Sequence, residues 1–275
     1  MRLKIAITGA GGVVGGAILS NLQSHNYDVT GFFYKKGKIQ EQCLDLSSSD
    51  VSKKTDCNPL SLFDIVIHCA AITKPNNRGF LSAGENTNML ENLLLLLNAE
   101  QHLTFFSSID VELLKKYKCT TESNFNLVYA KSKIECEQIL LQSKLKRVSI
   151  LRLAPLYSND HLEDIAKRVL VPKFLTLKIR LIPSPSYRLC HENIVTSYAK
   201  DILNSQYREQ FKIYYLNDEK LIKQKEFLNY FKGINIVFPL ILLRLISLML
   251  TLFLKFEKIK KVDIMLAKLI GDENK

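Results

Sequence analysis

The stretch LKIAITGAGGVVGGAILSNL, residues 3–22, decides the fold of this 275-residue chain. Leu3 to Thr8 is a short apolar run rich in β-branched residues, which predicts a buried strand. Apolar residues then recur at helical spacing after a glycine-rich turn. Glycines at 9, 12 and 15 allow a tight turn, a close approach to a pyrophosphate and close packing of helix on strand, and the helix N-terminus offers N–H groups to phosphate. The stretch therefore predicts a dinucleotide site.

Apolar strands and helical segments alternate over the first 160 residues. Strands are predicted at 29–34, 42–46, 64–71, 103–108 and 148–153, and helices at 86–99 and 129–142. The run DIVIHCAA at 64–71 is apolar nearly throughout, which is typical of a strand buried in a parallel sheet. We therefore expect an α/β fold, a doubly wound parallel sheet with helices on both faces.

The regular alternation ends near Pro155, and further prolines interrupt a region of shorter elements. We expect residues 1–160 to form the dinucleotide-binding domain. Residues 161–275 would form a smaller, mixed α/β substrate-binding cap with an apolar C-terminal helix. The cap would cover the carboxyl edge of the sheet, where open α/β sheets bind ligands.

The composition is that of a globular protein, with 47% hydrophobic and 24% charged residues. The net charge is +11, but the cations are spread along the chain, so we expect no nucleic-acid partner. The six cysteines contain no CxxC pair, and no two of the five histidines stand three to five residues apart. We therefore expect neither a metal site nor a disulfide framework. The first apolar run ends in glycines rather than a cleavage site, which indicates a cytoplasmic protein without a signal peptide.

The segment YAKSK places Tyr129 and Lys133 four residues apart, on one face of a predicted helix. Tyrosine titrates near pH 10, so acid–base work near pH 7 needs a pKa shift of about three units, or roughly 4 kcal/mol. Lys133 and a positively charged nicotinamide would together supply that shift. The pattern also occurs on solvated helix faces. Here, however, the strand at 103–108 ends in Ser108, whose hydroxyl would reach the same substrate oxygen.

Several ordered motifs resemble the extended short-chain dehydrogenase/reductase superfamily, in particular its nucleotide-sugar epimerases, dehydratases and reductases. They are TGAGGVVG at 8–15, Asp45-Leu46, DIVIHCAA at 64–71, Asn86, SSIDV at 107–111, TES at 121–123, YAKSK at 129–133 and LRLAPLY at 151–157. The resemblance covers about the first 160 residues and implies a Rossmann domain.

The resemblance also implies roles for individual residues. Those implied for the cofactor are Gly9, Gly12, Val13 and Val14 around the pyrophosphate, Asp45 and Leu46 beside the adenine, and Ala70 and Ala71 along its middle. Tyr129 would be the general acid and base, Lys133 would hold the nicotinamide ribose and lower the tyrosine pKa, and Ser108 would bind the reacting oxygen. Arg180 and Arg188 would bind the diphosphate of a nucleotide sugar, with surface arginines as the alternative. His68 and Cys69 end a buried strand, where a satisfied core histidine is the simpler interpretation.

Departures from the family pattern narrow the expected activity. Sugar dehydratases that this chain resembles carry a T-D-E run where it has Ser108-Ile109-Asp110. Ile109 cannot protonate a leaving hydroxyl, so 4,6-dehydration is disfavoured. Many relatives also have a substrate-binding asparagine where Pro155 stands and a glycine where Ser158 stands, which leaves the substrate contacts open.

The residues after the second predicted strand favour NADP over NAD, although NAD is not excluded. An acid at the end of that strand would bind the ribose hydroxyls and repel a 2′-phosphate, and none occurs between Asp28 and Glu41. Tyr34, Lys35 and Lys36 occupy the region instead. We therefore expect Lys35 to contact the cofactor, the alternative being that these lysines are merely solvated.

The run from Ile236 to Leu254 is 19 residues of almost unbroken apolar sequence. Pro239 would begin a helix there, and Arg244 at the centre argues against a membrane span. The helix would carry one narrow polar stripe, formed by Arg244, Ser247, Thr251, Lys255 and Lys258. Two interpretations remain: burial in the second domain or a dimer, or contact with a membrane surface through Lys255, Lys258, Lys260 and Lys261.

Taken with the resemblance, the residues predict a homodimeric enzyme that transfers hydride at a sugar carbinol or ketone, as an epimerase or a 4-ketoreductase. The resemblance implies a role in surface polysaccharide biosynthesis, and a dimer formed through the helices at 86–99 and 129–142. Five consecutive leucines at 93–97 would add apolar surface there. A hydroxysteroid-type dehydrogenase is one alternative. A non-catalytic NADP-binding sensor is another, although it would not need Ser108, Tyr129 and Lys133 together.

Overall fold

The glycine-rich segment forms the predicted strand, turn and helix, in which β1 (Lys4–Thr8) leads into α1 (Val13–Ser24). The computed structural model describes residues 3–34, 43–48, 51, 58–73, 84–112, 114, 125–171, 174–203, 211–253 and 257–271. The chain divides into two compact units, Met1–Leu153 with Glu192–Leu216, and Ala154–His191 with Asn217–Lys275. The single boundary expected near residue 160 therefore differs from this division, because the segment 192–216 returns to the first unit.

In the described part of the first unit, six strands form one sheet in the order β11-β5-β4-β3-β1-β2. The strands besides β1 are β2 (Asp28–Phe32), β3 (Ile65–His68), β4 (His102–Ser108), β5 (Arg147–Leu153) and β11 (Phe211–Leu216). Every neighbouring pair is parallel. All residues of β3 and β4 are buried, including the polar ones of β4, because both are inner strands of the sheet.

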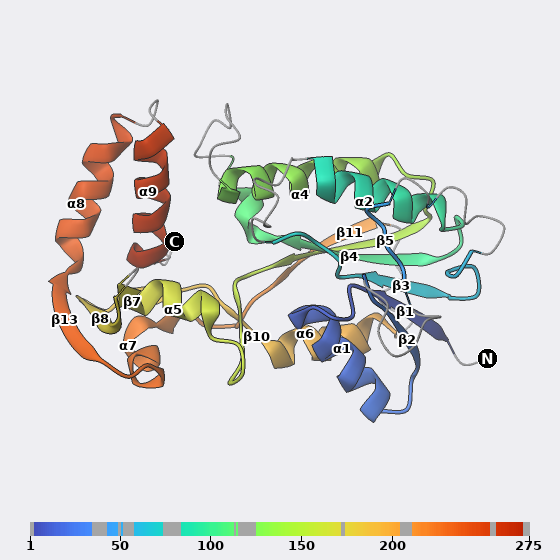
Figure 1. Ribbon diagram of the computed structural model, residues 1–275, viewed down its shortest axis with the longest axis horizontal. Coiled ribbons are helices and arrows are strands. Elements are labelled where there is room, and N and C mark those ends of the chain that lie inside the picture. Colours follow the sequence, from blue (N-terminus) through green and yellow to red (C-terminus); the bar gives the residue numbers. More distant parts are fainter. Residues whose placement is uncertain are drawn as a thin grey trace. The chain divides into compact units, whose positions relative to one another are not determined.

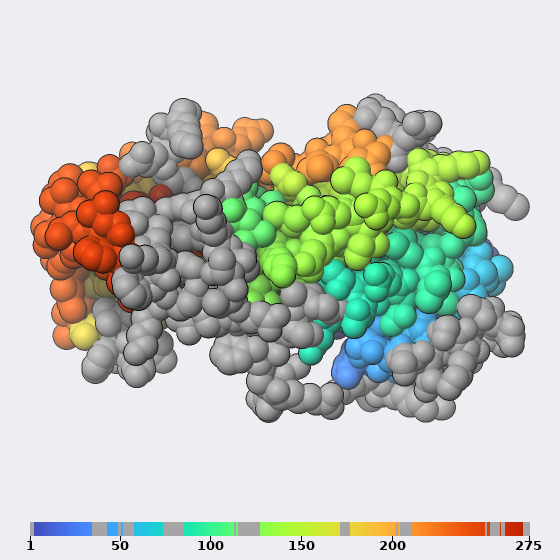
Figure 2. Space-filling model, turned by 90° about the horizontal axis from the view of Figure 1, so that it is seen from above, coloured from blue at the N-terminus to red at the C-terminus, as the bar shows by residue number. Residues whose placement is uncertain are grey.

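Helices cover both faces of this sheet (Figure 1). One face carries α2 (Gly84–Leu95) and α4 (Phe125–Leu141), and the other carries α1 and α6 (Glu192–Ile202). Figure 2 views the first face, on which α2 and α4 lie side by side. The core between these helices and the sheet is apolar, with Leu90, Leu103, Cys136 and Ile150 among its buried residues. The predicted α/β fold, a doubly wound parallel sheet, is confirmed.

One predicted strand is wrong. Residues 43–46 make only an isolated bridge, between Phe33 and Cys43, and then turn, because Asp45 accepts hydrogen bonds from Ser47 instead of continuing a ladder. The sixth strand of the sheet is β11, about 60 residues beyond β5 in the chain, and the sequence analysis did not predict it.

The second unit is built from short elements, as expected for a mixed α/β region. Its strands are β6 (Leu156–Tyr157), β7 (Leu170–Val171), β8 (Phe174–Ile182), β9 (Ser186–Tyr187), β10 (Cys190–His191), β12 (Ile222–Lys223) and β13 (Ile234–Pro239). Its helices include α5 (Glu163–Val169), α7 (Gln224–Phe227), η5 (Leu228–Tyr230), α8 (Leu240–Thr251) and α9 (Glu257–Ile270). Ile165, Tyr187 and Phe227 lie in one small core of this unit, and Leu181, Leu240 and Leu243 form another.

Candidate functional site

The turn after β1 leaves no room for a side chain at Gly9 or Gly15. Gly9 has a φ of 75°, and a Cβ atom on it would lie 2.5 Å from the backbone nitrogen of Ala70. A Cβ atom on Gly15 would lie 2.4 Å from the Gly9 carbonyl oxygen, because α1 packs directly on the turn. Gly12 caps α1 without a side-chain hydrogen bond, and the first helical turn holds no acid. No acidic side chain would therefore repel an anion from the backbone N–H groups of that turn. This fits the binding of a dinucleotide pyrophosphate.

The other residues expected around the cofactor's phosphates lie at the same edge of the sheet. Val13 and Val14 form the first turn of α1, and the Val13 side chain is exposed. Ala70 and Ala71 follow β3, whose last residue pairs with the last residue of β1. The structure thus brings together residues that stand 60 positions apart in the sequence.

The segment expected beside the adenine follows the end of β2. Asp45 Oδ1 accepts hydrogen bonds from the backbone nitrogen and the hydroxyl of Ser47, at 2.9 and 2.6 Å. Leu46 is buried in the core, and its carbonyl accepts a hydrogen bond from Asn92 at 2.8 Å. These contacts fix the backbone of the two residues that the resemblance places beside the adenine. Lys35 lies outside the described residues, so its expected contact with the cofactor stays a prediction.

Lys133 and Tyr129 lie on α4 against the carboxyl end of β4. The Lys133 side chain is only 2% exposed, and its Nζ donates a hydrogen bond to the Phe106 carbonyl oxygen at 2.8 Å. The same Nζ lies 5.7 Å from the centre of the Tyr129 ring, and Tyr129 is half-buried. Ser108, at the end of β4, accepts a hydrogen bond from the backbone nitrogen of Asp110 at 3.1 Å. The Lys133 ammonium therefore lies near the ring of Tyr129, at the edge of the sheet where the glycine turn lies.

Burial sets the protonation of the groups around Lys133. Burial lowers the pKa of Lys133 itself, and nearby Cys136, Cys69 and Glu137 partly oppose this shift. Burial, and then the Lys133 charge, lower the pKa of His68 to about 3. His68 Nδ1 lies 2.7 Å from the Thr8 hydroxyl, so it is a neutral core histidine with a hydrogen-bond partner. Burial also raises the pKa of the Cys69 thiol, which argues against a nucleophilic role.

Asn86 connects the segment after β3 to the helix that carries Tyr129. Its Oδ1 accepts a hydrogen bond from the Ile72 backbone nitrogen at 2.9 Å, and its Nδ2 donates to the Ser132 hydroxyl at 3.1 Å. Ser132 in turn donates to the carbonyl oxygen of Tyr129 at 2.8 Å. The YAKSK spacing did not indicate this role for Ser132, because its partner stands 46 residues away.

A second buried network holds α4 one turn beyond Lys133. Glu137 accepts hydrogen bonds from Ser107 at 2.6 Å and from Arg152 at 2.6 and 3.1 Å. Arg152 also donates to the Tyr215 hydroxyl at 2.7 Å. The carboxylate and the phenol raise the pKa of Arg152, so it stays charged. This network ties α4 to β4, β5 and β11, and sequence reasoning missed it because acids on a helix are usually solvated.

The candidate substrate residues Arg180 and Arg188 lie in the second unit. Arg180 is exposed on β8 and lines a hollow of about 350 Å³ with Lys223, Lys225 and Ser184. Arg188 is half-buried and is not among the residues that line this hollow. The structure therefore gives Arg180 a cationic setting but does not join the two arginines at one hollow.

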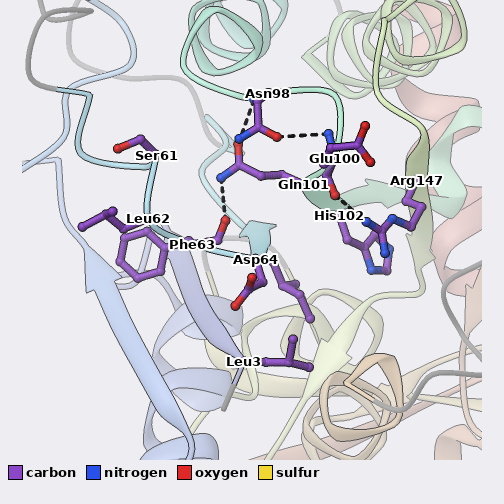
Figure 3. A pocket seen from close by; sticks show the side chains of 11 residues that line it. Leu3, Ser61, Leu62, Phe63, Asp64, Asn98, Glu100, Gln101, His102 and Arg147 are labelled. Carbon is purple, nitrogen blue, oxygen red and sulfur yellow. Dashed lines mark hydrogen bonds between the residues drawn. The ribbon is translucent and has the colours of Figure 1, made fainter. Parts of the chain in front are cut away.

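Another hollow, of about 280 Å³, lies at the opposite edge of the sheet from the glycine turn (Figure 3). Its lining includes Asp64, His102 and Arg147, which stand at the amino ends of β3, β4 and β5. Ligands of open α/β sheets bind at the carboxyl ends. Hydrogen bonds join the loops beside the hollow, for example from Gln101 Nε2 to the Phe63 carbonyl oxygen at 2.7 Å (Figure 3). We therefore assign this hollow to the fold and not to the active site.

In the part of the chain that the structure describes, no group of three or more His, Cys, Asp or Glu side chains is placed to hold a metal ion. A parallel sheet, a glycine turn after β1 and a tyrosine–lysine pair on the helix beside β4 define a nicotinamide-dependent enzyme of the short-chain dehydrogenase/reductase type. The chain belongs to the NAD dependent epimerase/dehydratase family, whose model matches residues 5–177, more than half of the sequence. It is therefore an enzyme of the NAD-dependent epimerase/dehydratase type.

Solved structures share this fold. A short-chain dehydrogenase/reductase superfamily protein from Agrobacterium tumefaciens with bound NAD is similar, with 14% identity, 86% of each chain covered and a TM-score of 0.62. The UDP-Glc/GlcNAc 4-epimerase from Campylobacter jejuni is 15% identical, covers 86% of this chain and 87% of its own, and has a TM-score of 0.62. The dTDP-4-dehydrorhamnose reductase from Bacillus anthracis in complex with NADP is 17% identical, with coverages of 87% and 85% and a TM-score of 0.58. No curated protein matches the chain.

Proposed function

We propose that this chain is a cytoplasmic enzyme that transfers hydride at a carbinol or ketone carbon of a nucleotide-activated sugar. It would act as a 4-epimerase through a 4-keto sugar or as a 4-ketoreductase, in surface polysaccharide biosynthesis. The observation that carries the proposal is the buried Lys133 ammonium, 5.7 Å from the Tyr129 ring at the carboxyl edge of the sheet. Similar proteins include a UDP-Glc/GlcNAc 4-epimerase and a dTDP-4-dehydrorhamnose reductase, and both classes of reaction suit this pair.

Each polar group at this edge has a role in the proposed reaction. A bound nicotinamide supplies the hydride acceptor or donor. Tyr129 takes the hydroxyl proton of the sugar as the carbinol C–H bond breaks, and returns a proton to the oxygen when the C–H bond forms again. Lys133 favours the phenolate of Tyr129 and would hold the nicotinamide ribose of a bound cofactor. Since the Ser108 oxygen accepts from the Asp110 amide, the hydroxyl's own proton can be donated to the sugar oxygen.

The replacement of Tyr129 by Phe tests the acid–base role. Tyr129→Phe removes the proton donor but leaves the glycine turn intact. We expect turnover of UDP-sugars to be abolished, while NADP binding weakens by less than about tenfold, or about 1.4 kcal/mol. Tyr27→Phe is the matched control, because Tyr27 is exposed beyond α1. Unchanged turnover in Tyr129→Phe would refute the assignment, and no turnover in the unmutated protein would favour the sensor hypothesis.

The nicotinamide absorbance separates the two reactions. An epimerase retains its cofactor, so it isomerises the sugar with no net change in absorbance. A reductase consumes reduced cofactor in proportion to the product formed. Incubating the protein with UDP-sugars, with and without added NADPH, therefore decides between them.

We propose NADP as the preferred cofactor. Tyr34 follows β2 with 57% of its side chain exposed, and no acid stands between Asp28 and Glu41 to repel a 2′-phosphate. Lys35 and Lys36 would then meet that phosphate. Tighter binding of NAD than of NADP in a calorimetric titration would overturn this preference.

We also propose a homodimer formed through α2 and α4. These helices lie side by side on one face of the sheet (Figure 2), with Leu95 59% and Leu141 62% exposed. Of the five leucines at 93–97, Leu93 and Leu96 are buried in the core, so the apolar surface is smaller than the sequence predicted. A monomer by light scattering at micromolar concentration would contradict this proposal.

A further inference from the structure

The apolar run 236–254 is not one continuous helix. β13 ends at Pro239, and α8 begins at Leu240 and has 12 residues, or about 18 Å of length. A span needs about 30 Å of apolar length, and no helix among the described residues is long and apolar enough to cross a membrane. Whatever α8 contacts, it does not cross a bilayer.

A narrow face of α8 packs against α9, beside which it lies in Figure 1. Leu240 and Leu243 are buried on this face. Ser247 donates a hydrogen bond to Asp263 Oδ1 at 2.5 Å. Burial in the second domain, one of the two interpretations of the sequence, therefore holds for a minority of the helix.

The rest of α8 exposes large apolar side chains. Those that are at least one-third exposed are Ile241, Leu242, Leu245, Ile246, Leu248 and Met249, followed by Leu252 and Phe253 in the next turn. At 100° per residue, the six on the helix cover an arc of about 160°. Arg244 is exposed beside one border of this arc, next to Leu248 and not in its middle. We call these eight residues the α8 face.

The charged residues of the segment that carries the α8 face are all cations. Residues 227–256 contain no Asp or Glu, and their charged residues are Lys232, Arg244 and Lys255. The sequence that follows, residues 257–263, has three lysines and two acids, Glu257 and Asp263, and Asp263 is buried against Ser247. An apolar arc with Arg244 at its border, in a segment without acids, complements a surface with an apolar interior and anionic groups above it. Two copies of the chain meeting through this face would instead bring cations together without acids from this segment between them.

We propose that the α8 face binds the surface of an anionic phospholipid membrane, with α8 lying in the plane of the interface. The apolar arc enters the boundary between headgroups and acyl chains, and Arg244 extends from its border to the phosphates. The cations of the segment add electrostatic attraction to the anionic leaflet. The membrane surface would then hold the enzyme without a spanning helix.

Sedimentation with lipid vesicles tests the proposal on the full-length chain. The vesicles are phosphatidylcholine alone or phosphatidylcholine with about one-quarter phosphatidylglycerol. We expect the protein to sediment with the anionic vesicles and much less with the neutral ones. The double variant Leu245→Glu/Met249→Glu places acids at the centre of the arc and should weaken binding by roughly tenfold or more. Arg244→Gln should weaken it about fivefold, the effect of one cation near an anionic surface.

Leu62→Glu is the matched control, because Leu62 is 74% exposed in the first unit and lies outside the α8 face. It should sediment like the unmutated protein. Thermal unfolding of the variants without lipid should be unchanged, since the replaced side chains are exposed. No sedimentation of the unmutated protein, or equal sedimentation of the double variant, would overturn the proposal. A lower molar mass of the double variant in lipid-free solution would also overturn it, and would assign the α8 face to a second copy.

Discussion

Replacing Lys133 by Met should stabilise the cofactor-free protein while abolishing turnover. The ammonium donates one hydrogen bond to Phe106 and lies 4.7 and 5.7 Å from the ring centres of Phe105 and Tyr129. Removing a charge from water costs several kcal/mol. A hydrogen bond to a charged group offsets about 1.5–3 kcal/mol, and each ring contact about 1 kcal/mol. A penalty of about 1–2 kcal/mol remains, and Met carries none of it at a similar side-chain length.

Thermal unfolding without cofactor measures this difference. A gain of about 1–2 kcal/mol should raise Tm by about 2–8 °C in a protein of this size. Lys131→Met is the matched control on the same helix, because the Lys131 side chain is 48% exposed and pairs with Glu135 at 3.7 Å. It should change the free energy of unfolding by less than about 0.5 kcal/mol. A lower Tm for Lys133→Met than for Lys131→Met at neutral pH would refute the reasoning.

The lowered pKa of Lys133 also predicts how the stability difference between Lys133→Met and the unmutated protein changes with pH. Because burial lowers the pKa of Lys133, the folded protein releases this proton at a lower pH than the unfolded chain does. Below the folded pKa the charge is present in both states, and the penalty on the folded state is complete. As pH rises toward the ordinary lysine pKa of about 10.4, the folded state loses the charge first and the penalty is relieved. The advantage of Lys133→Met over the unmutated protein should therefore shrink as the solution becomes more alkaline.

Three further predictions concern stability. Gly9→Ala should lower the free energy of unfolding by about 2–5 kcal/mol, because Gly9 has a positive φ and an added Cβ would meet backbone atoms. Gly11→Ala is the control and should change little in urea titrations, because its Cβ would meet only a ring carbon at 3.5 Å. Equal losses in the two variants would contradict this prediction. Because His68 keeps a pKa of about 3 when folded, the unfolded chain alone gains its proton below pH 6.5, so stability should fall there by up to about 1.4 kcal/mol per pH unit, and His68→Phe should reduce that slope. Glu137→Leu should lower the free energy of unfolding by about 3 kcal/mol, because it leaves the Arg152 charge without its carboxylate. The double variant Glu137→Leu/Arg152→Leu should recover most of that loss. No recovery would show that the two residues are not coupled.

The parts of the fold that the sequence predicted are those set by local patterns. The strand, turn and helix of residues 4–24 need only apolar spacing and glycines, and their order in the chain is their order in space. β3 was recognisable because burial on both faces leaves a nearly uninterrupted apolar run around it, whereas β4 mixes apolar residues with polar ones. The strand predicted at 42–46 was wrong because Asp45 accepts two hydrogen bonds from Ser47 and the chain turns there. The apolar residues around Asp45 do not indicate this turn.

Elements whose partners are distant in the chain were not predicted. β11 has exposed residues on both sides of its central portion, so its sequence does not read as a buried strand, and it joins the sheet through β5 alone. The C-terminal apolar run posed the opposite problem. Apolar sequence predicts burial equally for all its residues, but only packing decides that Leu240 and Leu243 face α9 while Leu245 and Met249 face outward.

The candidate site shows the same division between residues that do chemistry and residues that position them. Tyr129, Lys133 and Ser108 could be proposed from the sequence because a phenol, an ammonium and a hydroxyl at fixed spacing have few other uses together. The contacts of Asn86 and Glu137 could not be predicted, because amides and carboxylates are common on solvated helix surfaces. Only the folded structure shows that their partners are Ile72 and Arg152. Their burial fixes α4 on both sides of Lys133, and a buried ammonium is held in place only if the helix carrying it cannot move away to water. The polar contacts that the sequence did not reveal are therefore what allow Lys133 to remain buried beside Tyr129.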